Sequence, residues 1–122
     1  MKWQFSNSAP IYTQLIEQIK MAIVSGAFPA GERLPSVREL AAETGVNPNT
    51  MQRAMTELER DGLVHSQRTA GRFVTEDGEV IAAARRQLAE RHLETFLAAM
   101  EGLGYEQQEI EALLRQRTEK EE

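Results

Sequence analysis

The stretch SVRELAAETGVNPNTMQRAMTELERD, residues 36–61, contains two helix-start signals in close succession. Ser36 followed three residues later by Glu39 is the pattern of a capping box, in which each side chain binds the backbone amide of the other residue. Asn47 directly before Pro48 is the second signal, because Asn is favoured at the N-cap and Pro at the first helical position. A glycine between the two signals predicts a turn. We therefore expect two helices joined by a tight turn.

The flanking residues predict a further helix before this stretch and a small hairpin after it. Apolar side chains recur every three or four positions in residues 10–25, which predicts an amphipathic helix closed by Gly26. Residues 63–67 and 72–75 are expected to form two short strands around a turn at residues 68–71. Two helices joined by a short turn and followed by a hairpin are the layout of a winged helix-turn-helix.

The C-terminal part of the chain predicts two more helices. After a hinge at Asp77-Gly78, helices are expected over residues 79–100 and 106–117, with two glycines between them. The expected fold class is mainly α (α+β). It consists of a winged helix-turn-helix domain, residues 1–76, and a short two-helix dimerisation tail, residues 77–122.

The apolar side chains of this tail need a covering surface, because a two-helix hairpin cannot cover the apolar stripes of both its helices. A second copy of the chain supplies that surface by symmetry, so a homodimer is expected. The residues expected at the dimer seam are Leu88, Phe96, Leu97, Met100, Ile110, Leu113 and Leu114.

Charge is unevenly distributed along the chain. The net charge is -5, which argues against a basic protein that binds nucleic acid through its global charge. Residues 1–75 nevertheless carry a net +1, with eight basic and seven acidic side chains, and the remainder carries −6. An anionic partner is therefore expected on the first 75 residues.

The third expected helix, from Pro48 to about Asp61, has an apolar face and a polar face. On a helical wheel the apolar residues fall on one side, and these are Met51, Ala54, Met55 and Leu58. The opposite side carries Asn49, Gln52, Arg53 and Thr56, with Thr50 at its edge. Amides, hydroxyls and guanidinium groups form hydrogen bonds with base edges and phosphates, so this face is a candidate for DNA recognition.

Four arginines are expected to converge around that face. Arg38 lies at the start of the preceding helix, where helix N-termini bind phosphate, and Arg68 and Arg72 flank the tip of the hairpin. Together with Arg53 they predict double-stranded DNA as the partner. The candidate DNA-contacting residues are Arg38, Asn47, Asn49, Thr50, Gln52, Arg53, Arg68, Thr69 and Arg72. The alternative is a winged-helix module that binds another protein, which should instead expose apolar residues on this face.

Residues 11–75 also resemble the DNA-binding domain of the GntR family of bacterial transcription regulators. The matching stretches are Pro10-Ile11-Tyr12, Ile23-Val24-Ser25-Gly26, PAGERLPSVRELA from Pro29 to Ala41, Gly45-Val46-Asn47, Ala54, Leu58, Asp61-Gly62-Leu63-Val64 and Gly71-Arg72-Phe73-Val74. The resemblance implies DNA contacts by Arg38, Asn47, Asn49, Thr50 and Arg68, with Gln52 and Arg53 as further candidates. The sequence departs from the family at Pro48, where many members have arginine, and at Thr69-Ala70, where glycine is frequent.

The short C-terminal part is similar to that of the YtrA subfamily. The similarity lies in Leu103-Gly104-Tyr105, Glu109-Ile110 and Leu113-Leu114. It implies a repressor of an operon that includes an ABC transporter. A dimer with two recognition helices would bind an inverted-repeat operator.

Other functions find less support in the sequence. There is no cysteine, the two histidines are far apart, and no nucleophile–base pair can be identified, so we expect no enzyme activity, no metal and no cofactor. There is no apolar run of membrane-spanning length and no signal peptide, so a cytoplasmic protein without membrane contact is expected. A small-molecule effector is left open; it would lie between the first helix and the tail or at the dimer seam, because the tail has little room for a pocket of roughly 300 Å³.

Overall fold

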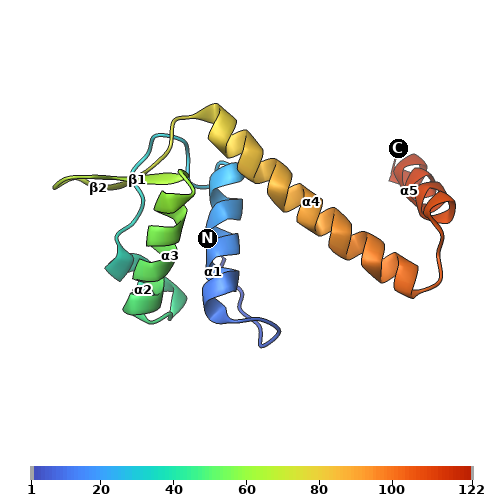
Figure 1. Ribbon diagram of the computed structural model, residues 1–122, viewed down its shortest axis with the longest axis horizontal. Helices are drawn as coiled ribbons and strands as arrows, with labels where there is room; N and C mark the ends of the chain where they lie inside the picture. Colours follow the sequence, from blue (N-terminus) through green and yellow to red (C-terminus); the bar gives the residue numbers. More distant parts are fainter. Residues whose placement is uncertain (1, 122) are drawn as a thin grey trace. The chain divides into compact units, whose positions relative to one another are not determined.

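The computed structural model describes residues 2–121 (Figure 1). Its elements follow the order α1 (Ile11–Val24), α2 (Val37–Thr44), α3 (Pro48–Arg60), β1 (Val64–Gln67), β2 (Gly71–Val74), α4 (Gly78–Gly102) and α5 (Gln107–Glu121). The chain divides into two compact units, a head unit that extends to Arg86 and a tail unit that begins at Gln87, so the division falls within α4. The predicted fold class, mainly helical with a winged helix-turn-helix and a helical C-terminal region, is confirmed.

The core of the head unit lies where α3 packs against α1 and α2 (Figure 1). The predicted apolar face of α3 is buried almost completely, with Met51, Ala54, Met55 and Leu58 each at most 1% exposed. Burial of this stripe removes apolar surface from water and sets the orientation of α3, so its opposite side must face solvent. The start of α4 also packs on this core, through Val80, Ile81 and Ala84.

Both predicted helix-start signals form as expected. The Ser36 hydroxyl accepts a hydrogen bond from the Glu39 amide at 3.1 Å, and the Ser36 amide donates to Glu39 Oε1 at 3.2 Å. Asn47 Oδ1 accepts from the Asn49 amide at 2.8 Å at the start of α3. Gly45 ends α2 with a φ of 75°, in the left-handed region where glycine carries no Cβ penalty.

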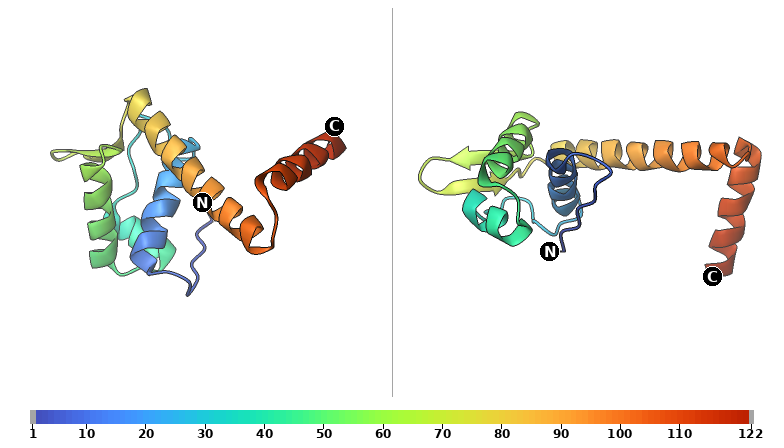
Figure 2. Two further views of the ribbon diagram at one scale, coloured as in Figure 1. Left: turned by 45° about the vertical axis from the view of Figure 1, so that its right-hand side comes forward. Right: turned by 90° about the horizontal axis from the view of Figure 1, so that it is seen from below.

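The hairpin is an antiparallel pair with Val64 opposite Val74 and Gln67 opposite Gly71. Both strands differ by one residue from the prediction. The first begins at residue 64, because the amide of Leu63 instead bonds to the Leu58 carbonyl at 3.1 Å and closes the end of α3. The second covers residues 71–74, because Gly71 pairs with Gln67 at the tip. Both views in Figure 2 show the turn of this hairpin extending beyond the three helices of the head unit.

The loop before α2 pairs with β2 through residues 32–34. The sequence did not predict that this segment is extended. The Leu34 amide donates to the Arg72 carbonyl at 2.8 Å, and the Val74 amide donates to the Glu32 carbonyl at 3.0 Å. Arg33 and Phe73 form an isolated antiparallel bridge. The loop before α2 is thereby fixed to the hairpin by backbone hydrogen bonds.

Several helix boundaries differ from those expected, most of them by one or two residues. α1 begins at Ile11, because Pro10 has a ψ of 142° and serves as the N-cap. α4 includes Gly102, and the chain leaves the helical conformation at Gly104, whose φ is 95°. α5 extends to Glu121, beyond the predicted end at residue 117.

Candidate nucleic-acid interface

The polar face of α3 is open to solvent, as the burial of its apolar face requires. Asn49, Gln52, Arg53 and Thr56 are exposed, and Thr50 is half-buried. The Thr56 hydroxyl donates to the backbone carbonyl of Gln52 at 3.0 Å, within the helix. This face therefore presents two side-chain amides and one guanidinium group to a partner.

Arg53 has a contact that the sequence did not indicate. Its guanidinium carbon lies 4.5 Å from the centre of the Tyr12 ring, which comes from α1. A cation over an aromatic face is held electrostatically, so Tyr12 restricts the positions that the exposed Arg53 guanidinium occupies. Tyr12 comes two positions after Pro10 at the start of α1, and this local pattern carries no signal for a pair with Arg53.

A hollow of about 280 Å³ lies between α3, the start of α2 and the hairpin. Three of its lining residues are arginines, namely Arg33, Arg38 and Arg72, and Gln52 of α3 lines it as well. The N-terminus of α2 opens into the same place through Ser36 and Val37. Several guanidinium groups around a helix N-terminus favour an anion, and a phosphate group matches them in charge and in hydrogen-bond acceptors.

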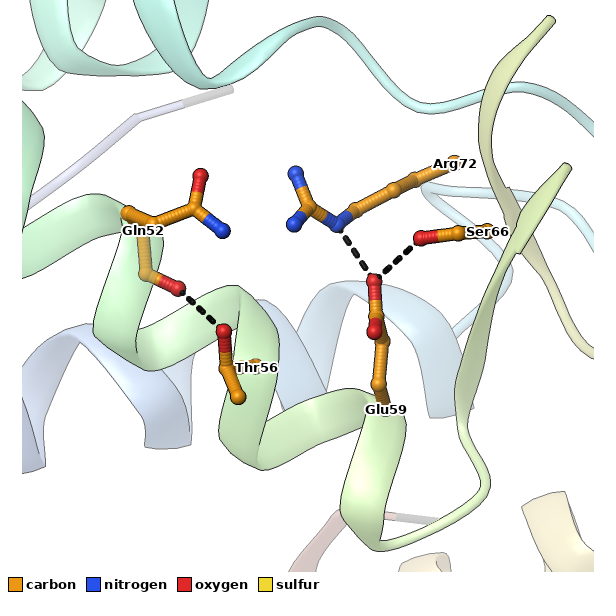
Figure 3. A network of polar contacts seen from close by, with 5 residues as sticks. All are labelled: Gln52, Thr56, Glu59, Ser66 and Arg72. Carbon is orange, nitrogen blue, oxygen red and sulfur yellow. Dashed lines mark hydrogen bonds and ion pairs between the residues drawn. The ribbon is translucent and has the colours of Figure 1, made fainter. Parts of the chain in front are cut away.

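Arg72 is held in place from α3 (Figure 3). Its Nε lies 2.6 Å from Glu59 Oε1, and the Ser66 hydroxyl donates to the same oxygen at 2.6 Å. The hydrogen bond from Ser66, followed by those from Arg72 and its positive charge, keeps the pKa of Glu59 below its usual 4.5, although partial burial acts in the opposite direction. The Glu59 carboxylate therefore joins α3 to both strands of the hairpin.

The tip of the hairpin carries Arg68 and Thr69, both exposed. Thr69 has a φ of 67°, in the left-handed region. The Ala70 amide donates to the Gln67 carbonyl at 3.0 Å, which closes the turn. The departure from a frequent glycine at this place therefore leaves a β-branched residue in a conformation that suits glycine.

The structure thus brings some of the four predicted arginines together. Arg38 and Arg72 line one hollow with Gln52, Arg53 lies over Tyr12, and Arg68 is at the tip of the hairpin. Sequence reasoning missed Arg33 on the wall of the hollow and Glu59 behind Arg72. The spacing of Gln52, Thr56 and Glu59, at positions i, i+4 and i+7, is a signal that could have placed Glu59 on the same side of the helix as Gln52. These assignments of DNA contacts remain predictions.

Two other features, a metal-binding cluster and a membrane-spanning helix, are not found in the part of the chain that the structure describes. It contains no group of three or more His, Cys, Asp or Glu side chains arranged to hold a metal ion. None of its helices combines the length and the apolarity that a membrane crossing requires.

A helix-turn-helix with a polar exposed third helix, a basic hollow and a projecting hairpin defines a winged-helix DNA-binding protein. Comparisons with known proteins specify the family. Residues 11–74 match the family described as "Bacterial regulatory proteins, gntR family". The chain is 41% identical over 107 residues, 88% of either protein, to the uncharacterized HTH-type transcriptional regulator YhcF of Bacillus subtilis (strain 168). It is 42% identical over 73 residues to the HTH-type transcriptional repressor YtrA of the same organism, covering 60% of this chain and 56% of YtrA.

Solved structures agree with this result. A GntR family transcriptional regulator from Listeria monocytogenes superposes with a TM-score of 0.83 at 38% identity, covering 92% of this chain and 98% of that chain. The DNA-binding domain of AraR in complex with operator ORX1 has a TM-score of 0.53 at 29% identity, covering 62% of this chain and 92% of that one. The chain belongs to the GntR family, in its YtrA subfamily, and is a DNA-binding transcription regulator, as its sequence resemblance implied.

Proposed function

We propose that this chain is a transcriptional repressor that binds an inverted-repeat operator as a homodimer and controls an operon that includes an ABC transporter. The observation that carries the proposal is the exposed polar face of α3, flanked by the basic hollow and the hairpin tip. The similarity to YtrA, which is named as a repressor, supports repression. The transporter operon rests on the subfamily resemblance alone.

The proposed contacts divide into base reading and phosphate binding. Asn49 and Gln52 carry amides that suit adenine, and the Arg53 guanidinium suits guanine. Arg38 at the start of α2 and Arg68 at the hairpin tip suit phosphates. The remaining proposed contacts are Asn47, Thr50, Thr69 and Arg72.

The surface of α3 favours DNA over a protein partner. Its four apolar residues are buried in the head unit, and the residues that face solvent are amides, hydroxyls and an arginine. A protein-binding face would instead leave apolar side chains exposed at its centre. The exposed face of α3 therefore fits DNA better than it fits another protein.

The homodimer is supported by apolar side chains that a single copy leaves exposed. Of the seven residues expected at the seam, Leu88 and Ile110 are already buried, and Phe96 and Met100 are half-buried. Leu97, Leu113 and Leu114 remain exposed. Leu93 and Leu103 add to this exposed surface, at 57% and 73%. A second copy would cover these leucines, and we propose that they form the centre of the seam.

A small-molecule effector would act through the dimer. One hollow beside the first turn of α5 is lined by Glu106, Gln107, Gln108 and Glu111, all of them exposed and polar. Such a lining lacks the apolar walls of most ligand pockets. We therefore propose that any effector alters how the two heads are arranged and binds outside this hollow.

Selection of binding sites from random duplex DNA, with the full-length chain at one stated salt concentration, tests the proposal. We expect enriched sites with two inverted half-sites whose centres are separated by roughly one helical turn or a multiple of it. Retention of random DNA without an enriched motif would contradict sequence-specific recognition. An enriched single half-site or a direct repeat would contradict the two-fold dimer.

A further inference from the structure

Glu59 is an acidic residue on the side of the molecule proposed to meet DNA. It lies on α3, two turns after Gln52, and a negative charge there opposes the approach of phosphates. Its side chain is half-buried, and one oxygen, Oε1, is shared by Arg72 and Ser66. A surface evolved only for electrostatic attraction would have a neutral or basic residue at this position.

The contacts of Glu59 determine how Arg72 is presented. The carboxylate binds Nε, which is the nitrogen nearest the Arg72 stem. Figure 3 shows the two terminal nitrogens of Arg72 directed away from Glu59 and toward the side-chain amide of Gln52. A guanidinium group is planar, so fixing Nε also fixes the direction of its two terminal nitrogens.

The place to which Arg72 points is suited to a phosphate. Arg72 and Gln52 both line the basic hollow, together with Arg33, Arg38 and the N-terminus of α2. A DNA phosphate held there would fix the register in which the neighbouring Gln52 meets a base, since phosphate contacts orient a protein on the duplex. The hollow is therefore lined both by α3, through Gln52, and by the hairpin, through Arg72.

We propose that Glu59 is a positioning residue for operator binding: it holds Arg72 so that its terminal nitrogens contact a DNA phosphate in the basic hollow and set the register of Gln52. The proposal rests on the proposed function, since it assumes a preferred operator. It assigns to an acidic residue a favourable role in DNA binding, and this separates it from a purely electrostatic account.

The test compares affinities for a selected operator and for random duplex DNA, at one salt concentration, using full-length protein. Glu59→Gln removes the charge and weakens the hold on Arg72. We expect operator affinity to fall roughly tenfold, the effect of a charged hydrogen bond. Affinity for random DNA should stay the same or rise, because a negative charge has been removed. If affinity for both DNAs rises by the same factor, Glu59 acts only as a charge and the proposal is wrong.

One further variant separates the effect of the Glu59 charge from that of its side-chain length, and a second serves as a control. Glu59→Asp keeps the charge but is one methylene shorter, so it should lose operator preference in the same direction as Glu59→Gln. Glu57→Gln is the matched control, because Glu57 lies on the same helix and pairs with Arg60 at 3.2 Å. It should leave the ratio of the two affinities unchanged. An Asp variant with wild-type preference would overturn the positioning role.

A double-mutant cycle shows whether Glu59 acts through Arg72. In an Arg72→Gln background, Glu59→Gln should cause no further loss of operator preference. An equal loss in both backgrounds would contradict the proposal. Failure of the proposed function looks different, because the wild-type protein would then show no preferred duplex in the selection. Thermal unfolding of each variant identifies any that does not fold, and the Asp variant then replaces the Gln variant in the cycle.

Discussion

Thr69 is the one non-glycine residue with a positive φ among residues 2–121. In this conformation the Cβ of an L-residue crowds the backbone, and branching at Cβ makes the crowding worse. Thr69 lies at the exposed tip of the hairpin. Its left-handed conformation lowers stability there without affecting the packing of other residues. The tip therefore carries a local strain that other side chains would relieve.

Thr69→Gly and Thr69→Asn should each raise stability. The left-handed conformation costs an ordinary residue roughly 1–2 kcal/mol. Glycine loses part of this gain because its unfolded chain is more flexible, so the net effect should be below about 1 kcal/mol. Chemical denaturation measures the difference. Thr69→Val, which retains branching at Cβ, serves as the control and should not be more stable than the wild-type protein.

The ion pair of Glu59 should make stability depend on pH. Because the folded-state pKa of Glu59 is below its usual 4.5, the carboxylate stabilises the fold fully above that value, and this contribution disappears as the pH falls through the folded pKa. Unfolding of the wild-type protein and of Glu59→Gln should therefore differ most near neutral pH. The difference should shrink below about pH 4.5. A difference that stays constant down to pH 3 would contradict this assignment.

Arg53 and Arg68 should have different roles in binding. Arg53→Ala should lose base discrimination, because a guanidinium–guanine contact contributes about 1–3 kcal/mol to specificity. Arg68→Ala should weaken binding to operator and to random DNA by similar factors, as expected for a phosphate contact. Binding-site selection with each variant checks both expectations. Full information content in the sites selected by Arg53→Ala would show that another residue reads the base.

At the scale of elements, side-chain hydrogen bonds fix the ends of the short helices. α2 has eight residues, too few to be stable alone, and its start depends on the capping box and on burial of Leu40 and Ala41.

The N-terminal segment before α1 is also fixed by side-chain hydrogen bonds. The Gln14 and Gln18 side chains of α1 pair with the backbone of Ser6 and Gln4, and the segment runs back along α1 (Figure 2).

Ser36→Ala should destabilise the head unit by about 1 kcal/mol, the usual cost of losing an N-cap side chain. The same substitution should change the titration of Glu39. Its pKa is below the usual 4.5 chiefly because of hydrogen bonds with the Ser36 backbone and hydroxyl. Loss of the hydroxyl should raise this pKa toward its usual value, which NMR titration of the Glu39 carboxyl can follow. Ser36→Thr retains the hydroxyl and should preserve both properties.

At the scale of the whole molecule, the proposed DNA contacts and the proposed dimer seam lie in different units. The head unit contains the core and all the proposed DNA contacts. The tail unit leaves leucines exposed that a second copy would cover. The head unit includes the start of α4, whose side chains pack on the core, so a truncation must retain residues up to Arg86.

A fragment of residues 1–86 should fold and remain monomeric, and it should bind an inverted-repeat operator more weakly than the full chain. Joining two heads makes the second binding event intramolecular, so the loss should be roughly 10²–10⁴-fold. Sedimentation of both proteins and operator titrations at one salt concentration measure this. A monomeric full-length protein, or a fragment with undiminished operator affinity, would contradict the homodimer.

Much of the fold was predictable because its signals are local. The cap residues Ser36 and Asn47, and the apolar stripe of α3, act within a few residues of themselves, and each formed as predicted. The stripe also determined which face of α3 is exposed, so Gln52 and Arg53 could be identified as candidates from periodicity. Family resemblance reflects the same local patterns.

Contacts between residues far apart in the sequence could not be predicted and became visible only in the folded chain. Tyr12 under Arg53, Arg33 beside Arg72, and Glu59 across from Ser66 depend on how α1, the loop before α2 and the hairpin meet α3. Sequence periodicity assigns a residue to a face, but the partner on that face is set by the packing of other elements. For this reason the sequence alone determined which face of α3 is exposed to solvent, and only the folded chain showed which side chains orient its arginines.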